Sequence, residues 1–284
     1  MGMQVDAGWM TWINERPCPN AEPHSPRQPA HRVLAVECVA FRYPASMVNV
    51  ICMRWGTKFG PEYPNRLHSM VSRHLKRPHR FICMTDDPAG LAPGIEARPL
   101  PDFDDPGGPE RGWRKISTFR KPLFDLTGST LFLDLDIVIV DSIDCLFDHP
   151  GEFLIIKDWV RPWRPTGNSS VYRFEAGAHP ELLDRFQREA AQVRREVRNE
   201  QEYISRELHR AGKLGYWPAE WCVSFKYRCM AKFPMNRWVK PSIPAGAKIV
   251  VFHGHPTPRE AIDGVTTKIT RHVHPTPWVA EHWR

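Results

Sequence analysis

The 284-residue sequence lacks several features that would each assign it to a class of protein. Its seven cysteines form no Cys-x-x-Cys pair, so we expect no zinc site and a reducing, cytoplasmic setting. No apolar run approaches the roughly 18 residues that a transmembrane helix requires. No hydrophobic signal segment follows Met1, which adds to the expectation of a cytoplasmic protein.

The basic residues are spread along the chain, and they do not form the kind of run that is typical of a nucleic-acid-binding arm. The 39 basic residues exceed the 32 acidic ones, which gives a net charge of +7, but no run of about five like charges occurs. We therefore expect no nucleic-acid partner. The positive surplus suits an anionic substrate, and it leaves peripheral association with an acidic membrane open.

The chain divides into two stretches of different composition. Residues 1–46 are polar and rich in proline, which predicts a disordered or loosely packed extension and leaves Met47 as an alternative start. Residues 47–284 contain no repeat and no second boundary. The whole chain is 42% hydrophobic and 25% charged, as ordinary folded proteins are. We therefore expect residues 47–284 to form a single α/β domain.

The domain opens with a strand, a helix and a second strand, which predicts a mostly parallel central sheet flanked by helices. Ligands of such sheets lie beyond the carboxyl ends of the strands, here at Arg54–Tyr63. Further strands are expected at 95–100, 152–156 and 167–174, with the last at 249–252. Helices are expected from Glu62 to Leu75, from Gly112 to near Asp125 with a kink or an earlier end at Pro122 as the alternative, and from His179 and Glu200 onward.

The most informative stretch is Leu131–Val140, an apolar run interrupted only by Asp134 and Asp136. Apolar runs of this kind predict a buried strand, and residues two apart in a strand leave the same face. Because burying ionised carboxylates is costly, two of them together call for a cation. Hard oxygen ligands favour Mg²⁺ or Mn²⁺, which commonly bind carboxylates together with the phosphates of a substrate.

The ordered set of motifs resembles the GT-A fold glycosyltransferases of family 8, the glycogenin and bacterial galactosyltransferase type. Leu131–Val140 resembles their metal-binding Asp-x-Asp strand, and Asn168–Val171 resembles their Asn-Ser-Gly-Val turn, with Ser170 in place of glycine. Glu200–Glu202 resembles their Asp-Gln-Asp helix start, with glutamate replacing both aspartates. Val251–Gly254 resembles their His-Phe-x-Gly, although the histidine stands next to the glycine.

The resemblance implies a GT-A type fold with a nucleotide-binding βαβ half and an acceptor-side half. It implies transfer of a sugar from a nucleoside diphosphate donor, UDP-sugar in particular, to a glycan or other hydroxyl acceptor. The metal ligands would be Asp134, Asp136 and His253, with His255 as a rival. The expected donor-side residues are Trp55, Lys58, Tyr63, Lys115, Asp134 and Lys226. The expected catalytic or acceptor-side residues are Asp158, Asn168, Gln201 and Glu202.

Lys115 and Arg114 are expected on the polar side of their helix, facing a cleft or water, where Lys115 could contact a phosphate. Two other functions stay open. Asp134–Val138 nearly fits the signature of haloacid dehalogenase phosphatases, in which the first aspartate is the nucleophile, but no later acidic pair follows. A non-catalytic sugar-nucleotide-binding module is the third hypothesis. The donor sugar, the acceptor and the stereochemistry are not fixed by the sequence.

Overall fold

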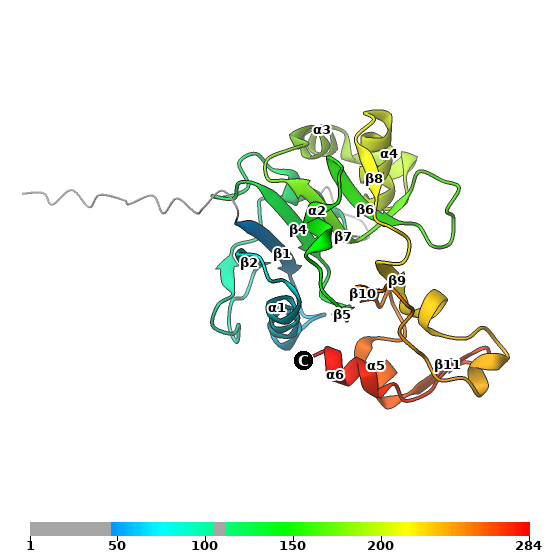
Figure 1. Cartoon of the computed structure of the whole chain (residues 1–284). Coiled ribbons are helices and arrows are strands. Elements are labelled where there is room, and N and C mark those ends of the chain that lie inside the picture. Colours follow the sequence, from blue (N-terminus) through cyan, green and yellow to red (C-terminus); the bar gives the residue numbers. More distant parts are fainter. Residues whose placement is uncertain (1–46, 105–111) are drawn as a thin grey trace, which may run out of the picture. The chain divides into compact units, whose positions relative to one another are not determined.

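The computed structural model describes residues 47–104 and 112–284, so the predicted extension at 1–46 lies outside the described residues. Its largest feature is a mixed seven-stranded sheet in the order β3-β2-β1-β4-β7-β6-β8 (Figure 1). The strands are β1 (Val48–Arg54), β2 (His79–Thr85), β3 (Glu96–Arg98), β4 (Ser129–Leu133), β6 (Phe153–Lys157), β7 (Gly167–Glu175) and β8 (Leu214–Tyr216).

The predicted βαβ opening is confirmed. β1 pairs in parallel with β2 and with β4, so the carboxyl ends of all three strands meet at one edge of the sheet. β7 runs antiparallel to both β4 and β6. The edge formed by β1 and β4 is therefore where a ligand is expected.

Two apolar cores cover opposite faces of this sheet, as the alternation of side chains along a strand requires. In β1, Val50 and Cys52 join one core, whereas Ile51 and Met53 join the other. The first core packs α1 against the sheet, and the second packs η1, α3 and α4. A strand buried on both faces explains the continuous apolar sequence of β1.

The helical elements connect and cover the strands. They are α1 (Glu62–His74), η1 (Trp113–Phe119), α2 (Cys145–Asp148), α3 (Pro180–Glu196), α4 (Glu200–Arg210), η2 (Phe225–Cys229), η3 (Met235–Arg237), α5 (Pro258–Asp263) and α6 (Pro277–His282). η1 is a short 3₁₀ helix that ends at Phe119, so the end near Asp125 is wrong and the alternative of an earlier end before Pro122 is confirmed. Pro122 disfavours helical geometry at the residue before it, which is consistent with this earlier end. No helix of the described residues is long and apolar enough to cross a membrane.

A second, three-stranded sheet has the order β5-β10-β9, with β5 (Ile137–Ile139), β9 (Cys222–Ser224) and β10 (Ile249–Val251). The prediction of one strand across Leu131–Val140 is wrong, because the chain leaves the first sheet after β4 and enters the second at β5. The prediction that the strand at 249–252 is the last is also wrong. The hairpin of β11 (Val265–Lys268) and β12 (Arg271–Val273) follows it.

Candidate active site

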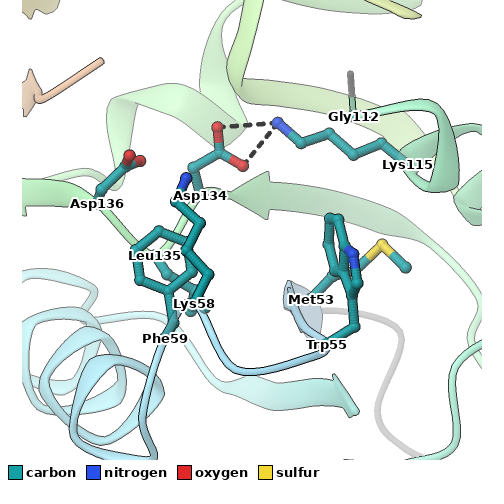
Figure 2. A pocket seen from close by; sticks show the side chains of 9 residues that line it. All are labelled: Met53, Trp55, Lys58, Phe59, Gly112, Lys115, Asp134, Leu135 and Asp136. Carbon is teal, nitrogen blue, oxygen red and sulfur yellow. Dashed lines mark hydrogen bonds and ion pairs between the residues drawn. The ribbon is translucent and has the colours of Figure 1, made fainter. Parts of the chain in front are cut away.

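A pocket of about 300 Å³ lies at the carboxyl edge formed by β1 and β4. We call it the acid-pair pocket. It is lined by the end of β1 and the loop after it, by the start of η1, and by the turn between β4 and β5 (Figure 2). The lining residues are Met53, Trp55, Lys58, Phe59, Gly112, Lys115, Asp134, Leu135 and Asp136. Trp55, Lys58, Lys115, Asp134 and Asp136 were predicted from the sequence.

The two acids occupy the turn that joins the two sheets. Asp134 directly follows β4, and its backbone N–H donates to Ser170 O at 2.9 Å, which extends the pairing of β4 with β7. Asp136 directly precedes β5, and its carbonyl accepts from Phe252 N at 3.0 Å. The acids share the pocket because of this turn, and not because they alternate along a single extended strand as predicted.

Asp134 is held by Lys115. The Lys115 Nζ lies 2.7 Å from Asp134 Oδ1 and 2.8 Å from Oδ2. Lys115 faces the acid-pair pocket, as one of the two expected alternatives has it, but it is only 8% exposed and reaches the pocket from within the core, not from a solvated helix side. Burial alone would lower the pKa of Lys115, but the charges of Asp134 and Glu200 outweigh burial and raise it. Lys115 is therefore a cationic partner of Asp134 at neutral pH.

Glu200 completes this buried network and was not predicted as a site residue. It lies at the first position of α4, is 5% exposed, and accepts a short hydrogen bond from Ser169 Oγ. Its Oε1 is 4.0 Å from Lys115 Nζ. Burial raises the pKa of Glu200, although Lys115 and Ser169 oppose that rise. The glutamate of the Glu-Gln-Glu motif was visible in the sequence, but its contact with Lys115 depends on the tertiary fold.

Asp136 has a different environment. In the described part of the chain, no other side chain forms a hydrogen bond or ion pair with its carboxylate, and Figure 2 shows it apart from the Lys115–Asp134 pair. Burial, reinforced by the charge of Asp134, raises the pKa of Asp136 to about 7. A half-buried carboxylate without a partner, beside a second carboxylate, fits a divalent cation with hard-oxygen preference.

The residues expected near the sugar form a polar cluster where β7 begins. Gln201 Oε1 lies 3.4 Å from both Asn168 Nδ2 and the backbone N of Ser169. Ser169 in turn contacts Lys115 and Glu200. The structure thus brings Asn168 and Gln201 to the edge of the buried network. Glu202 instead accepts from the backbone and side chain of Arg198, at 3.0 and 3.1 Å.

His253 and Lys226 follow two strands of the second sheet, Lys226 in η2 after β9 and His253 after β10, whose next residue, Phe252, pairs with Asp136. The His253 ring stacks on Trp159 with centroids 5.3 Å apart, its Nε2 is 2.7 Å from Ser224 Oγ, and Lys226 Nζ donates to its carbonyl. Burial, followed by the charges of Lys226 and Arg271, lowers the pKa of His253 to about 4. Its imidazole is therefore neutral at neutral pH, as a metal ligand must be.

No three His, Cys, Asp or Glu side chains converge at metal-binding spacing within residues 47–104 and 112–284. His253 as a third metal ligand therefore stays a prediction. Its Nε2 also lies within hydrogen-bond distance of the Ser224 hydroxyl. The rival, His255, is exposed and pairs through Nδ1 with Glu260 at 2.9 Å.

Of the two aromatic residues expected to contact a base, Trp55 lines the acid-pair pocket and Tyr63 does not. Trp55 lines the acid-pair pocket together with Phe59 and Met53, neither of which was predicted as a site residue. Tyr63 packs against Phe59 and Trp283, with ring centroids 4.7 and 5.4 Å away, and does not line the pocket. Apolar walls of this kind are typical of nucleotide sites, in which a few polar groups set orientation.

A second pocket, of about 430 Å³, contains Asp158. We call it the tryptophan pocket, after Trp159 and Trp217 in its lining. Asp158 Oδ1 accepts from the backbone N of Val160 and of Arg161, at 2.8 and 3.2 Å, so this acid also shapes the loop after β6. Trp159 links the two regions, because it lines this pocket and stacks on His253.

Comparison with known proteins bears on the fold. No protein-family model and no curated protein matches the sequence. A crystal structure of the galactosyltransferase LgtC in complex with donor and acceptor sugar analogues is similar, with a TM-score of 0.51 and 12% identity, over 74% of this chain and 88% of that chain. An active-site mutant of LgtC gives a TM-score of 0.55 and 13% identity, over 83% and 93%. The predicted GT-A type fold is confirmed by this likeness.

Proposed function

We propose that this chain is a metal-dependent glycosyltransferase that moves a sugar from a nucleoside diphosphate donor to an acceptor hydroxyl. One observation carries the proposal. Two carboxylates, Asp134 and Asp136, line a pocket at the carboxyl edge of parallel strands in a fold similar to that of a galactosyltransferase. The pocket combines these acids with nearby cations and an apolar wall, which is the chemistry that a nucleoside diphosphate requires.

The residues of the chain have separate roles in this proposal. Asp136 and Asp134 would hold Mn²⁺ or Mg²⁺, and the bound ion would stabilise the negative charge that gathers on the departing nucleoside diphosphate. Lys115 fixes the carboxylate of Asp134 in place. Lys58 is exposed at the pocket and is free to meet a phosphate. Lys226 lies close enough to Asp136 for the acid to affect its pKa.

The apolar wall of the acid-pair pocket suits the base of the donor. Trp55 and Phe59 provide ring faces, and Met53 provides an adaptable thioether side chain. We infer that a UDP-sugar is the donor, as the resemblance implies. On the acceptor side we place Asp158 in the tryptophan pocket, with Asn168, Gln201 and Glu202 where β7 and α4 begin.

The phosphatase alternative is disfavoured by strand order. Its nucleophile normally lies on the first strand of the sheet, whereas β1, β2 and β3 precede β4 in this chain. No further acids gather with Asp134 and Asp136 into a metal cluster in the described residues. A non-catalytic binding module would share the donor pocket, so only turnover distinguishes it from the enzyme.

The experiment is a screen of UDP-, GDP-, CMP- and dTDP-sugars for hydrolysis and for transfer to sugar acceptors, with Mn²⁺ and with a chelator. We expect Mn²⁺-dependent release of the nucleotide from a UDP-sugar, and its loss in Asp136→Asn. Donor binding without any turnover would favour the binding module. Release of inorganic phosphate from p-nitrophenyl phosphate, lost in Asp134→Asn, would favour the phosphatase.

A further inference from the structure

The charge of the chain is concentrated in one region of sequence. From Trp221 to Arg259 there is no aspartate or glutamate, although this stretch contains seven lysine and arginine residues. Acidic residues flank this stretch at Glu220 and Glu260 but do not occur within it. The whole protein has a net charge of +7, so this single stretch accounts for as much positive charge as the entire surplus.

The same region exposes large apolar side chains. Of the eight exposed large hydrophobic residues in the described ranges, two lie in the loop after β6, five lie in this stretch, and Ile269 lies in the hairpin of β11 and β12. Trp238 is 72% exposed and Ile269 is 75% exposed. We call this surface the basic-aromatic face. Its apolar members are Tyr227, Phe233, Met235, Trp238, Val239 and Ile269.

Hydrogen bonds join the two segments of the basic-aromatic face. The buried side chain of Asn236, in η3, donates through Nδ2 to Thr270 O and His272 O, at 3.2 Å each. Arg237 donates to Ile269 O at 3.1 Å. Figure 1 shows the segment after β9 reaching the β11–β12 hairpin, which carries Ile269 at its turn. The exposed residues are thus displayed from one hydrogen-bonded unit.

Four cations are each the direct chain neighbour of one of these apolar residues. Arg228, Lys232, Lys240 and Lys268 are all exposed, and none forms an ion pair with an acid in the described part of the chain. An exposed apolar patch without a covering element marks an interaction site. Trp, Phe and Met side chains beside Lys and Arg suit the boundary between lipid headgroups and acyl chains.

We propose that the basic-aromatic face binds the surface of an anionic lipid bilayer. The side chains of this face that are not aromatic favour a lipid surface over a single-stranded nucleic acid. Bases stack on aromatic rings, but Met235, Val239 and Ile269 offer no ring, whereas all three can enter an acyl boundary. Ile269 stands at a hairpin turn, a shape suited to shallow insertion rather than to docking in the plane of a partner protein.

The test is sedimentation of the full chain with vesicles of phosphatidylcholine alone and of equimolar phosphatidylcholine and phosphatidylglycerol. We expect binding to the anionic vesicles only, weakened by salt because exposed charges are screened. Lys232→Glu with Lys240→Glu should reduce binding more than about tenfold. Trp238→Ser with Ile269→Ser should also reduce binding while the melting temperature is unchanged.

Arg188→Glu with Arg195→Glu is the matched control, because it reverses two exposed cations of α3 and changes the net charge equally. We expect this control to retain more binding than the Lys232/Lys240 variant. Equal loss in both charge variants would overturn the assignment to this face. Absence of vesicle binding would contradict the proposal of a lipid partner. So would binding to a single-stranded oligonucleotide, if the Trp238/Ile269 variant loses that binding. These outcomes do not depend on sugar transfer.

Discussion

Lys115 Nζ lies 2.7 Å from Asp134 Oδ1, so one carboxylate of the acid pair has a buried cation as its partner before any ligand binds. Asp136, two residues later, has no such partner among the described side chains. The two acids therefore differ in what they need. Asp134 is oriented by the protein, and Asp136 presents a carboxylate that a ligand's cation can neutralise.

We expect Lys115→Met to destabilise the protein by about 3 kcal/mol, because it leaves Asp134 and Glu200 without their buried cation. Urea unfolding of both variants, without nucleotide, measures this free energy. Lys58→Met is the matched control, since Lys58 lines the same pocket but is exposed. The control should keep its stability and lose nucleotide affinity. Equal stability of the two variants would show that the buried pairing contributes little.

Gly112 adopts a left-handed conformation with φ of +80°, and an added Cβ would lie 2.7 Å from the carboxyl carbon of Glu200. We expect Gly112→Ala to cost more than the roughly 1 kcal/mol of backbone strain alone, because the methyl group displaces Glu200. Gly56→Ala is the control, with φ of +62° and no atom near the new Cβ. Thermal melting of both variants separates strain from displacement. Similar losses would mean that Glu200 moves aside without cost.

The burial of His179 makes the free energy of unfolding depend on pH. Its ring is buried, and burial together with Lys213 lowers its pKa below the ordinary value of 6.5. Below about pH 6.5 the unfolded chain binds the proton more strongly, so stability should fall as the pH falls through that value. Above it the group contributes no pH dependence.

We expect His179→Asn to reduce this acid sensitivity, since asparagine does not titrate and tolerates the φ of +60° found at residue 179. The measurement is the free energy of unfolding of both proteins from pH 8 to pH 5. If the free energies of unfolding of the two proteins change with pH in parallel across that range, the claim that His179 is buried as a neutral ring is wrong.

The sequence predicted the fold where apolar periodicity is strong and local. β1, α1 and β2 follow directly from such patterns, and a continuous apolar run identified the acid-pair stretch. The turn at Asp134–Asp136 was missed because it contains neither glycine nor proline, and Leu135 within it is buried like a strand residue. A break between two sheets depends on which partners the chain finds, and not on the run itself.

The buried network was less accessible to prediction than the pocket. The position of Lys115 was found, but its burial was not, since a lysine beside an arginine normally predicts a solvated helix face. Glu200 contacts Ser169 and Lys115, which lie 31 and 85 positions earlier in the chain. Contacts of this range come from the packing of α4 and η1 on one face of the sheet, which residue spacing does not encode.

The central claim is that Asp134 and Asp136 hold a divalent ion beneath the diphosphate of a sugar nucleotide. Calorimetric titration of UDP into the full chain, with Mn²⁺ and with a chelator, tests it together with a transfer assay. We predict that binding and transfer require Mn²⁺ and fall about a hundredfold or more in Asp136→Asn and Asp134→Asn, because each loses a ligand charge. Sugar transfer that persists in the chelator, or in both variants, would contradict the claim.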